Sequence, residues 1–247
     1  NYKNFFVSYC PGDNGGALGA AFIAHNTCEF DLESLKKPYT GPEFSKLDIE
    51  KTLLSKAYTK KVKFKYIELE SDLLKLAAEK ISDGNVIGWF QDKMEFGPRA
   101  LGNRSILADP RNQNIREILN LKIKRRENFR PFAPAIIDTS VKNWFEVEDD
   151  VPFMSKVFQV KEDKKKIIPA VTHIDGSGRL QTVSEKYNVN FYKLIKEFYN
   201  ITQVPILLNT SFNVKEPIVC TPSEAVSTFL TTDVKKLFLE NYVLSKK

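Results

Sequence analysis

Hydrophobic and polar positions follow two different periods along this chain, and together they predict an α/β fold. Apolar residues recur at helical spacing from Leu73 to Ile81, so we expect a helix over 72–82 with Ser71 as its N-cap. The apolar run 86–90 is typical of a buried strand that follows this helix. Further strands are predicted at 4–9, 62–68, 133–137, 204–208 and 237–239, and further helices at 17–25, 47–56, 115–123, 191–199 and 222–231. Strands and helices therefore alternate as in an α/β domain.

The first 45 residues differ from the rest and suggest a separate unit. Residues 11–16 are rich in glycine and form a predicted turn between the strand 4–9 and a helix of small residues, 17–25. A strand, a Gly-rich turn and a helix N-terminus can form a phosphate or metal site, although such turns are also common as plain structure. Residues 27–45 show little periodicity, so we expect a linker there. The chain opens with Asn1 inside a strand-like run, and we expect it to be the C-terminal part of something longer.

Charge and composition narrow the class of partner. The chain has 247 residues with 42% hydrophobic content, enough for a sizeable core, and its net charge of +6 is compatible with nucleic-acid binding. The dense charge run 161–166 mixes both signs, which is typical of a solvated loop. The other clustered basic residues lie among Gly, Pro and Phe instead. This setting favours a pocket over a surface that tracks a polyanion.

The cysteines and the absence of long apolar runs indicate in which cellular compartment the protein lies. Cys10, Cys28 and Cys220 are odd in number and far apart, which argues against a disulfide framework or a zinc site and favours a reducing environment. No apolar run approaches the roughly 18 residues of a membrane span, and no signal peptide opens the chain. We therefore expect a soluble, cytoplasmic protein with no membrane partner.

Three short segments carry the clearest chemical signal. The segments 96–105 and 124–134 concentrate six basic side chains beside glycines and prolines, which fix backbone shape. The segment 208–213 places amide and hydroxyl groups after an apolar run. Planar arginine forks and a lysine point charge suit phosphate or carboxylate oxygens, and amide and hydroxyl donors can complete the cradle. The three segments together predict a site for a small, highly charged anion.

Four ordered motifs resemble one family. The segments 12–20, 96–134, 173–183 and 208–213 look like successive signatures of the NodU-type carbamoyltransferases. The resemblance implies that residues 1–45 are the C-terminal remnant of an actin-like domain of the ATPase superfamily plus a linker. It implies that residues 46–247 form the family's YrdC-like C-terminal domain. The expected fold is therefore α/β, a YrdC-like twisted mixed sheet with flanking helices, preceded by a strand-turn-helix fragment of the actin-like domain.

The resemblance also implies a two-site enzyme. The YrdC-like domain would bind carbamoyl phosphate and ATP and form carbamoyl-adenylate. The actin-like domain would then transfer the carbamoyl group to a hydroxyl-bearing small molecule or glycan. Neither step demands a protein nucleophile, because positioning and charge neutralisation can supply most of the catalysis. Mg²⁺ would accompany ATP, since the nucleotide itself supplies ligands.

Residue by residue, the family pattern assigns roles to nine side chains of the YrdC-like part. Arg99 would lie near the reacting phosphates, and Lys124 and Arg130 would bind phosphate, so these three are the expected catalytic residues. Asn209 and Ser211 would act as neutral donors, though both can simply cap a turn. The remaining substrate-binding candidates are Arg104, Arg126, His173 and Arg179. Arg104, Arg125 and Arg126 can instead form surface ion pairs with Glu127, Asp109 or Glu117, and His173 can be an ordinary loop histidine.

The expected metal site of the family is not complete in this sequence. Asp13 matches the last aspartate of the site, which also uses two histidines on an upstream helix. The two histidines here, His25 and His173, do not lie in a paired motif ahead of Asp13. One carboxylate cannot hold a structured transition-metal site. We expect iron or another divalent metal only in the complete enzyme, and carbamoyl transfer to be absent from these residues alone.

Two other functions stay open. YrdC-type domains also serve tRNA modification, and Phe129 and Phe132 near Arg130 are possible stacking residues for RNA, although Pro131 and the following apolar strand favour packing. The second alternative is a non-catalytic module that binds its ligand without releasing pyrophosphate. Trp144 and Phe145, if exposed, are candidates for a homo-oligomer interface.

Overall fold

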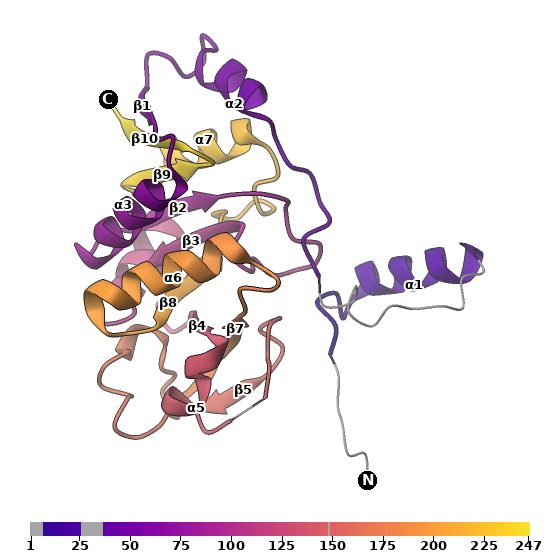
Figure 1. Ribbon diagram of the computed structural model, residues 1–247, viewed down its shortest axis with the longest axis vertical. Helices are drawn as coiled ribbons and strands as arrows, with labels where there is room; N and C mark the ends of the chain where they lie inside the picture. Colours follow the sequence, from indigo (N-terminus) through magenta and orange to yellow (C-terminus); the bar gives the residue numbers. More distant parts are fainter. Residues whose placement is uncertain (1–6, 26–36, 148) are drawn as a thin grey trace.

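One large mixed sheet organises the structure, a computed structural model that describes residues 7–25, 37–147 and 149–247. The sheet has eight strands in the order β1-β10-β9-β2-β3-β8-β4-β7 (Figure 1). The pairs β2–β9 and β4–β7 are parallel, and the remaining pairs are antiparallel. The strands of this sheet are β1 (Val62–Tyr66), β2 (Ile87–Phe90), β3 (Arg104–Ala108), β4 (Ala133–Ile137), β7 (Gln181–Val183), β8 (Ile206–Ser211), β9 (Lys236–Leu239) and β10 (Tyr242–Lys246). The predicted α/β class with a mixed sheet is confirmed.

Helices cover the sheet because their apolar stripes need burial. The long helices α3 and α6 pack side by side, with α3 against β2 and α6 against β8 and β4 (Figure 1). The helix α7 packs against β2 and β9 and contacts α2. A second, two-stranded sheet pairs β5 (Val157–Gln159) with β6 (Ser177–Arg179). The helices are α1 (Asp13–His25), α2 (Lys46–Leu53), α3 (Glu70–Ser82), α4 (Ile115–Glu117), α5 (Val141–Trp144), α6 (Val189–Thr202) and α7 (Pro222–Thr231), with 3₁₀ turns at Asp138–Ser140 and Pro169–Val171.

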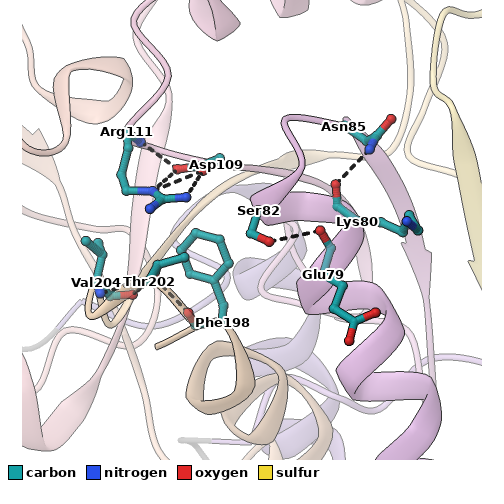
Figure 2. Close-up of polar contacts among 9 residues, drawn as sticks. All are labelled: Glu79, Lys80, Ser82, Asn85, Asp109, Arg111, Phe198, Thr202 and Val204. Atoms are coloured by element: carbon teal, nitrogen blue, oxygen red, sulfur yellow. Dashed lines mark hydrogen bonds and ion pairs between the residues drawn. The ribbon is translucent and has the colours of Figure 1, made fainter. Parts of the chain in front are cut away.

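The helix α3 shows how local sequence sets both of its ends. Its predicted apolar face is buried in the core, but the helix begins at Glu70, so Ser71 lies inside the first turn and the predicted cap is wrong. The N-cap is Leu69, which forms no side-chain cap, and Glu70 and Asp72 complement the positive end of the helix dipole instead. At the other end, Ser82 Oγ donates to Glu79 O and Asn85 Nδ2 donates to Lys80 O, both at 2.9 Å (Figure 2).

Figure 2 also shows how β3 is tied to α6. Arg111, just beyond β3, donates from Nη2 to Asp109 Oδ2 at 2.6 Å and from Nε to both carboxylate oxygens. Its guanidinium lies 5.5 Å from the ring centre of Phe198 in α6. Thr202 Oγ1 donates to Phe198 O at 2.7 Å and so satisfies a carbonyl in the last turn of α6. The contact between Arg111 and Phe198 joins the helix to the segment that follows β3.

Two elements that carry site residues differ from their predicted form. The strand β8 runs from Ile206 to Ser211, so Asn209 and Ser211 belong to the strand and do not follow it. It pairs with β3, which the sequence did not predict, and this pairing sets Ser105 opposite Ser211. The predicted helix 115–123 is α4 continued by a π-helical turn, Ile118–Ile123. The longer strand β8 and the π-helical turn bring polar residues to the same edge of the core.

The first 45 residues contact the rest of the structure along their described parts. The helix α1 starts at Asp13, so the helix already includes Gly15 and Gly16 of the predicted turn, and it buries no residue. Tyr9 and Cys10 are buried in a small apolar cluster with Leu101, Ala133, Phe153 and Met154. Residues 4–6 of the predicted strand 4–9, residues 27–36 of the predicted linker and Cys28 lie outside the described residues. Residues 7–9 are described and do not belong to a strand, so the prediction is wrong for this half. The division at residue 45 stays a prediction.

Several expectations about the surface were also tested. Residues 161–166 lie outside regular elements and form the ion pairs Lys164–Asp163 and Lys165–Glu162, as expected of a solvated loop. The suggestion of an interface at Trp144 and Phe145 is wrong, because both side chains are buried in the main core. Within the part of the chain that the structure describes, no helix combines the length and apolar character needed to cross a membrane.

Candidate functional site

A pocket of about 300 Å³ lies where the three anion-binding segments meet. Its wall is formed by the loop 98–100, the segment 130–133 and the end of β8, with Met154 and Val157 closing one side. Seven of the predicted site residues line it: Arg99, Arg126, Arg130, His173, Arg179, Asn209 and Ser211. Arg104, Lys124 and Asp13 do not line it. We call this hollow the arginine pocket.

The loop that carries Arg99 is held by backbone contacts and a buried carboxylate. Gly97 has φ +124°, and a Cβ at this position would lie 2.5 Å from Tyr9 O, so only glycine fits. Glu95 is 5% exposed, and its Oε1 accepts hydrogen bonds from the backbone amides of Leu101 and Asn103, both at 2.7 Å. The sequence analysis missed Glu95, although an acid just before a Gly-rich loop is a signal for such a clasp. The clasp fixes the backbone from which Arg99 projects.

No acidic side chain among the described lining residues balances the positive charge of the arginine pocket. Four arginines line the pocket, and none of its described lining residues carries a carboxylate. Burial, together with repulsion from Arg99 and Arg126, lowers the pKa of Arg179 to about 10. Burial and the nearby Arg130 also lower the pKa of Arg126. Repulsion of this kind disappears when an anion enters, so the pocket is built for a negatively charged ligand.

The pocket arginines differ in how firmly neighbouring residues fix their side chains. Arg126 donates from Nε to Asn120 Oδ1 at 2.7 Å, and its guanidinium lies 4.9 Å from the ring centre of Phe132. Arg130 forms an ion pair with Glu127 at 2.9 Å, but both side chains are more than half exposed. An exposed pair of this kind contributes little to stability, so Arg130 can turn toward a ligand at low cost. Arg99 is exposed and forms no hydrogen bond or ion pair with another described residue.

Lys124 lies behind the pocket wall. Its ammonium donates to Asn213 O at 2.9 Å, Asn213 Oδ1 at 2.8 Å and Ser211 Oγ at 3.2 Å, and also to Ser211 O. The π-helical turn that ends at Ile123 delivers the side chain, which is 2% exposed, to this position. In this structure Lys124 holds the end of β8 and the following loop in place. Asn213 was part of a predicted motif, but the sequence analysis gave it no role.

The environment of Lys124 predicts a pH dependence of stability. Burial, together with repulsion from Arg126, lowers the pKa of Lys124 from an ordinary 10.5 to about 7. Between these two values the unfolded chain holds a proton that the folded chain releases, so the free energy of unfolding should rise with pH. Urea unfolding from pH 7.5 to 9.5 measures this rise. Lys124→Arg, which stays charged throughout, should lack it, and equal slopes for both proteins would contradict the expectation.

Arg104 belongs to the core. The side chain is fully buried, and its guanidinium lies 3.5 Å from the ring centre of Phe90. Nη1 donates to the carbonyls of Gln91 and Asn103, and Nη2 donates to those of Pro42 and Asp92, at 2.7–3.1 Å. The structure therefore places Arg104 neither at the pocket nor in a surface ion pair. The carbonyls of Pro42 and Asn103 also accept backbone amides, from Met94 and Gln91, whereas no other donor is given to those of Gln91 and Asp92 among the described residues.

Arg125 and Arg126 are neighbours with different directions. Arg125 has φ 48°, which turns its side chain away from the arginine pocket, and its Nη2 donates to Thr231 O at 3.1 Å. It lines a second, larger pocket of about 650 Å³ between residues 214–220 and α7. This second pocket has mixed charge, because Glu216 and Glu224 also line it. The smaller pocket is therefore the better candidate for an anion site.

A chain of amide contacts positions Asn209 at the base of the arginine pocket. Asn209 Nδ2 donates to Gln181 Oε1 at 2.8 Å and to Ala100 O at 3.2 Å. Gln181 Nε2 donates in turn to Leu101 O at 2.8 Å. The network joins β8 and β7 to the loop that carries Arg99. Gln181 was not predicted, and its position within the motif 173–183 gave the only available signal.

Asp13 does not form a metal site with the other described residues. It is exposed at the first turn of α1. No group of three or more His, Cys, Asp or Glu side chains that could hold a metal ion exists in the described ranges. The donor set on these residues therefore does not fit a transition metal, and no chemical step is derived through one.

Fold and site together define a class, an α/β domain with an arginine-lined pocket. The family described as "Carbamoyltransferase C-terminus" matches residues 78–246. The chain belongs to this family.

Two named relatives match most or all of this chain. The nodulation protein NolNO of Sinorhizobium fredii is 43% identical over 100% of this chain and 36% of its own length. The 3'-hydroxymethylcephem-O-carbamoyltransferase of Amycolatopsis lactamdurans is 34% identical over 86% of this chain and 38% of its own length. A crystal structure of full-length HypF in the phosphate- and nucleotide-bound form has a TM-score of 0.47 and 18% identity, over 70% of this chain and 21% of HypF. The chain thus spans less than half the length of the curated relatives it matches.

Proposed function

We propose that this domain binds carbamoyl phosphate and ATP in the arginine pocket and forms carbamoyl-adenylate. The observation that carries the proposal is the set of four arginines around one pocket without a lining carboxylate. Carbamoyl phosphate is a small dianion, and ATP brings further phosphate groups, so both ligands would relieve the repulsion between these side chains. Membership of the carbamoyltransferase family supports the same chemistry.

In the proposed reaction the main task of the protein is to position the reacting groups. Hydrolysis of carbamoyl phosphate gives carbamate and phosphate, and a carbamate oxygen then attacks the α-phosphorus of ATP and expels pyrophosphate. Arg99 and Arg179 would stabilise charge on the reacting phosphates, while Ser211 and the backbone of β8 would orient them. Mg²⁺ would enter with the nucleotide, because no carboxylate of the described lining residues can bind it.

Transfer of the carbamoyl group would need more than these residues. Our proposal for the whole protein is O-carbamoylation of a hydroxyl-bearing acceptor, in line with the name of the cephem carbamoyltransferase relative. The described residues do not form a metal site around Asp13, so the transfer step is assigned to parts of the protein beyond this domain. A cytoplasmic location, with small molecules and not RNA as partners, is part of the same proposal.

Release of pyrophosphate tests the proposal directly. We expect this chain to release pyrophosphate from ATP only when carbamoyl phosphate is present. Binding of both ligands without pyrophosphate release would favour the non-catalytic alternative. A failure to bind either ligand, combined with salt-dependent RNA binding, would overturn the proposal in favour of the tRNA-modification alternative.

Anion binding should also stabilise the domain. Because the four arginines repel one another in the free protein, inorganic phosphate at about 100 times its Kd should add about 2.7 kcal/mol of stability, or about 5 °C in Tm. Thermal unfolding in phosphate and in sodium chloride of equal ionic strength separates specific binding from screening. A matching rise in chloride would show that the pocket has no preference for phosphate.

A further inference from the structure

The backbone of its loop determines where Arg99 lies. The side chain is exposed and forms no hydrogen bond or ion pair with another described residue. The loop 97–102 has a glycine at each end, and both Gly97 and Gly102 have positive φ. Because no side-chain partner fixes Arg99, the contacts that hold the two ends of this loop set the position of the guanidinium.

The N-terminal end of the loop is held by a segment from the first 45 residues. Residues 38–42, which we call the strap, run beside the residues that lead into the loop. Met94 N donates to Pro42 O at 3.1 Å, and Phe96 N donates to Pro38 O at 2.7 Å. These backbone hydrogen bonds anchor the chain one residue before the loop begins.

Tyr39 extends the hold of the strap to the other end of the loop. Its hydroxyl donates to Leu101 O at 3.1 Å, and its ring packs against the apolar cluster that contains Leu101. The same carbonyl accepts from Gln181, and the amide of Leu101 donates to Glu95, so this peptide group is held on both sides. Burial and the negative charge of Glu95 raise the pKa of Tyr39, so the hydroxyl stays a donor at neutral pH. The strap therefore contacts the loop at both ends.

We infer that Tyr39 is a positioning residue, which holds Arg99 at the arginine pocket and so makes residues before 46 part of the apparatus that forms the adenylate. This inference rests on the proposed function, because the reaction is what requires Arg99 in one place. A displacement of about 1 Å at a reacting group can lower a rate about 100-fold. A tyrosine that only filled space would be replaceable by phenylalanine without such a loss.

Hydrogen exchange in the free protein tests whether Tyr39 holds the loop. Tyr39→Phe keeps the ring and removes the hydroxyl. The amides of residues 96–103 should then exchange at least about fivefold faster, because the end of the loop opens more often without this hydrogen bond. Tyr58→Phe is the matched control, since the Tyr58 hydroxyl also donates to a carbonyl, Ser223 O, at 3.1 Å, and its loss should leave residues 96–103 unchanged.

Two results of the exchange experiment would overturn the inference. The first is an unchanged exchange rate of residues 96–103 in Tyr39→Phe. The second is an equal acceleration across the whole sheet, which would show a general loss of stability and no specific hold on the loop.

Carbamoyl-phosphate-dependent release of pyrophosphate tests whether this hold serves the reaction. Tyr39→Phe should lower kcat about tenfold and change KM less than about twofold, as expected when a group that acts on the rate is displaced. Tyr58→Phe should leave both values unchanged. In the Arg99→Met background, Tyr39→Phe should lower the rate less than about twofold further, because the group that it positions is already gone. Equal losses in both backgrounds would overturn the inference, since Tyr39 would then act independently of Arg99.

Failure of the proposed function gives a different result from failure of this inference. An unmodified chain that releases no pyrophosphate would overturn the proposed function, and with it the role of Tyr39 in the reaction, even if Tyr39→Phe loosens the loop. An unchanged kcat in Tyr39→Phe, beside an active unmodified chain and a loosened loop, would overturn the inference alone.

Discussion

Replacing Arg104 by methionine is expected to lower the free energy of unfolding by about 3–5 kcal/mol. The guanidinium is fully buried and donates to four backbone carbonyls, which belong to Pro42, Gln91, Asp92 and Asn103. Methionine fills part of the volume over Phe90 but offers no donor, so the carbonyls of Gln91 and Asp92 would lose their partners, while those of Pro42 and Asn103 keep one backbone amide each. The lost hydrogen bonds would weaken the junction of the segment near Pro42 with β2 and β3.

Urea unfolding of the Arg104→Met and Arg125→Met variants measures this effect. Arg125 is exposed and forms one hydrogen bond, to Thr231 O, so its replacement should cost less than about 1 kcal/mol. The comparison holds the substitution constant and changes only the environment. Similar small losses in both variants would show that water satisfies the carbonyls around Arg104.

Replacing Arg99 by methionine is expected to lower the rate of carbamoyl-phosphate-dependent pyrophosphate release by about 10²–10³-fold. Arg99 lines the arginine pocket and has no hydrogen bond or ion pair with another described residue, so its charge is available to a ligand. A group that stabilises charge as the reaction proceeds acts on the rate more than on binding of the free ligand. The folded structure should be unaffected, since the side chain is exposed.

Two measurements separate this role from a structural one. Steady-state pyrophosphate release gives kcat and KM, and thermal unfolding gives the stability of the same variant. The Arg125→Met protein is again the control, because Arg125 lines the second pocket and should leave the rate unchanged. A rate loss in Arg99→Met that comes with an equal loss of stability would contradict a direct role.

The fold was predictable where one face of an element is apolar. The helix α3 shows this pattern, and the structure confirms it. The strands β2 and β4 were predictable for another reason, because each is a continuous run that is buried on both faces. The strand β3 was missed because it begins with Arg104 and Ser105, which are polar and yet fully buried. Its burial depends on carbonyl partners from distant segments, and a local pattern does not contain that information.

The site was predictable as a set of motifs but not as an arrangement. The three basic and polar segments, together with the family resemblance for His173 and Arg179, pointed to seven residues that line one pocket. They did not show that Lys124 holds Ser211 and Asn213 from behind, because this depends on the π-helical turn before Lys124. Glu95 and Gln181 were also missed, since each acts through backbone groups of the Arg99 loop.

The pairing of β3 with β8 has a consequence for how the domain folds. Ser105 and Ser211 lie opposite each other at the centre of the sheet, although 106 positions of the sequence separate them. A contact between residues so far apart in sequence is slow to form, because the chain must close a long loop first. The arginine pocket takes side chains from both sides of this pairing. During synthesis, the pocket therefore cannot exist until residues beyond 211 have left the ribosome, and anion binding by a nascent chain would mark the late stage at which the sheet closes.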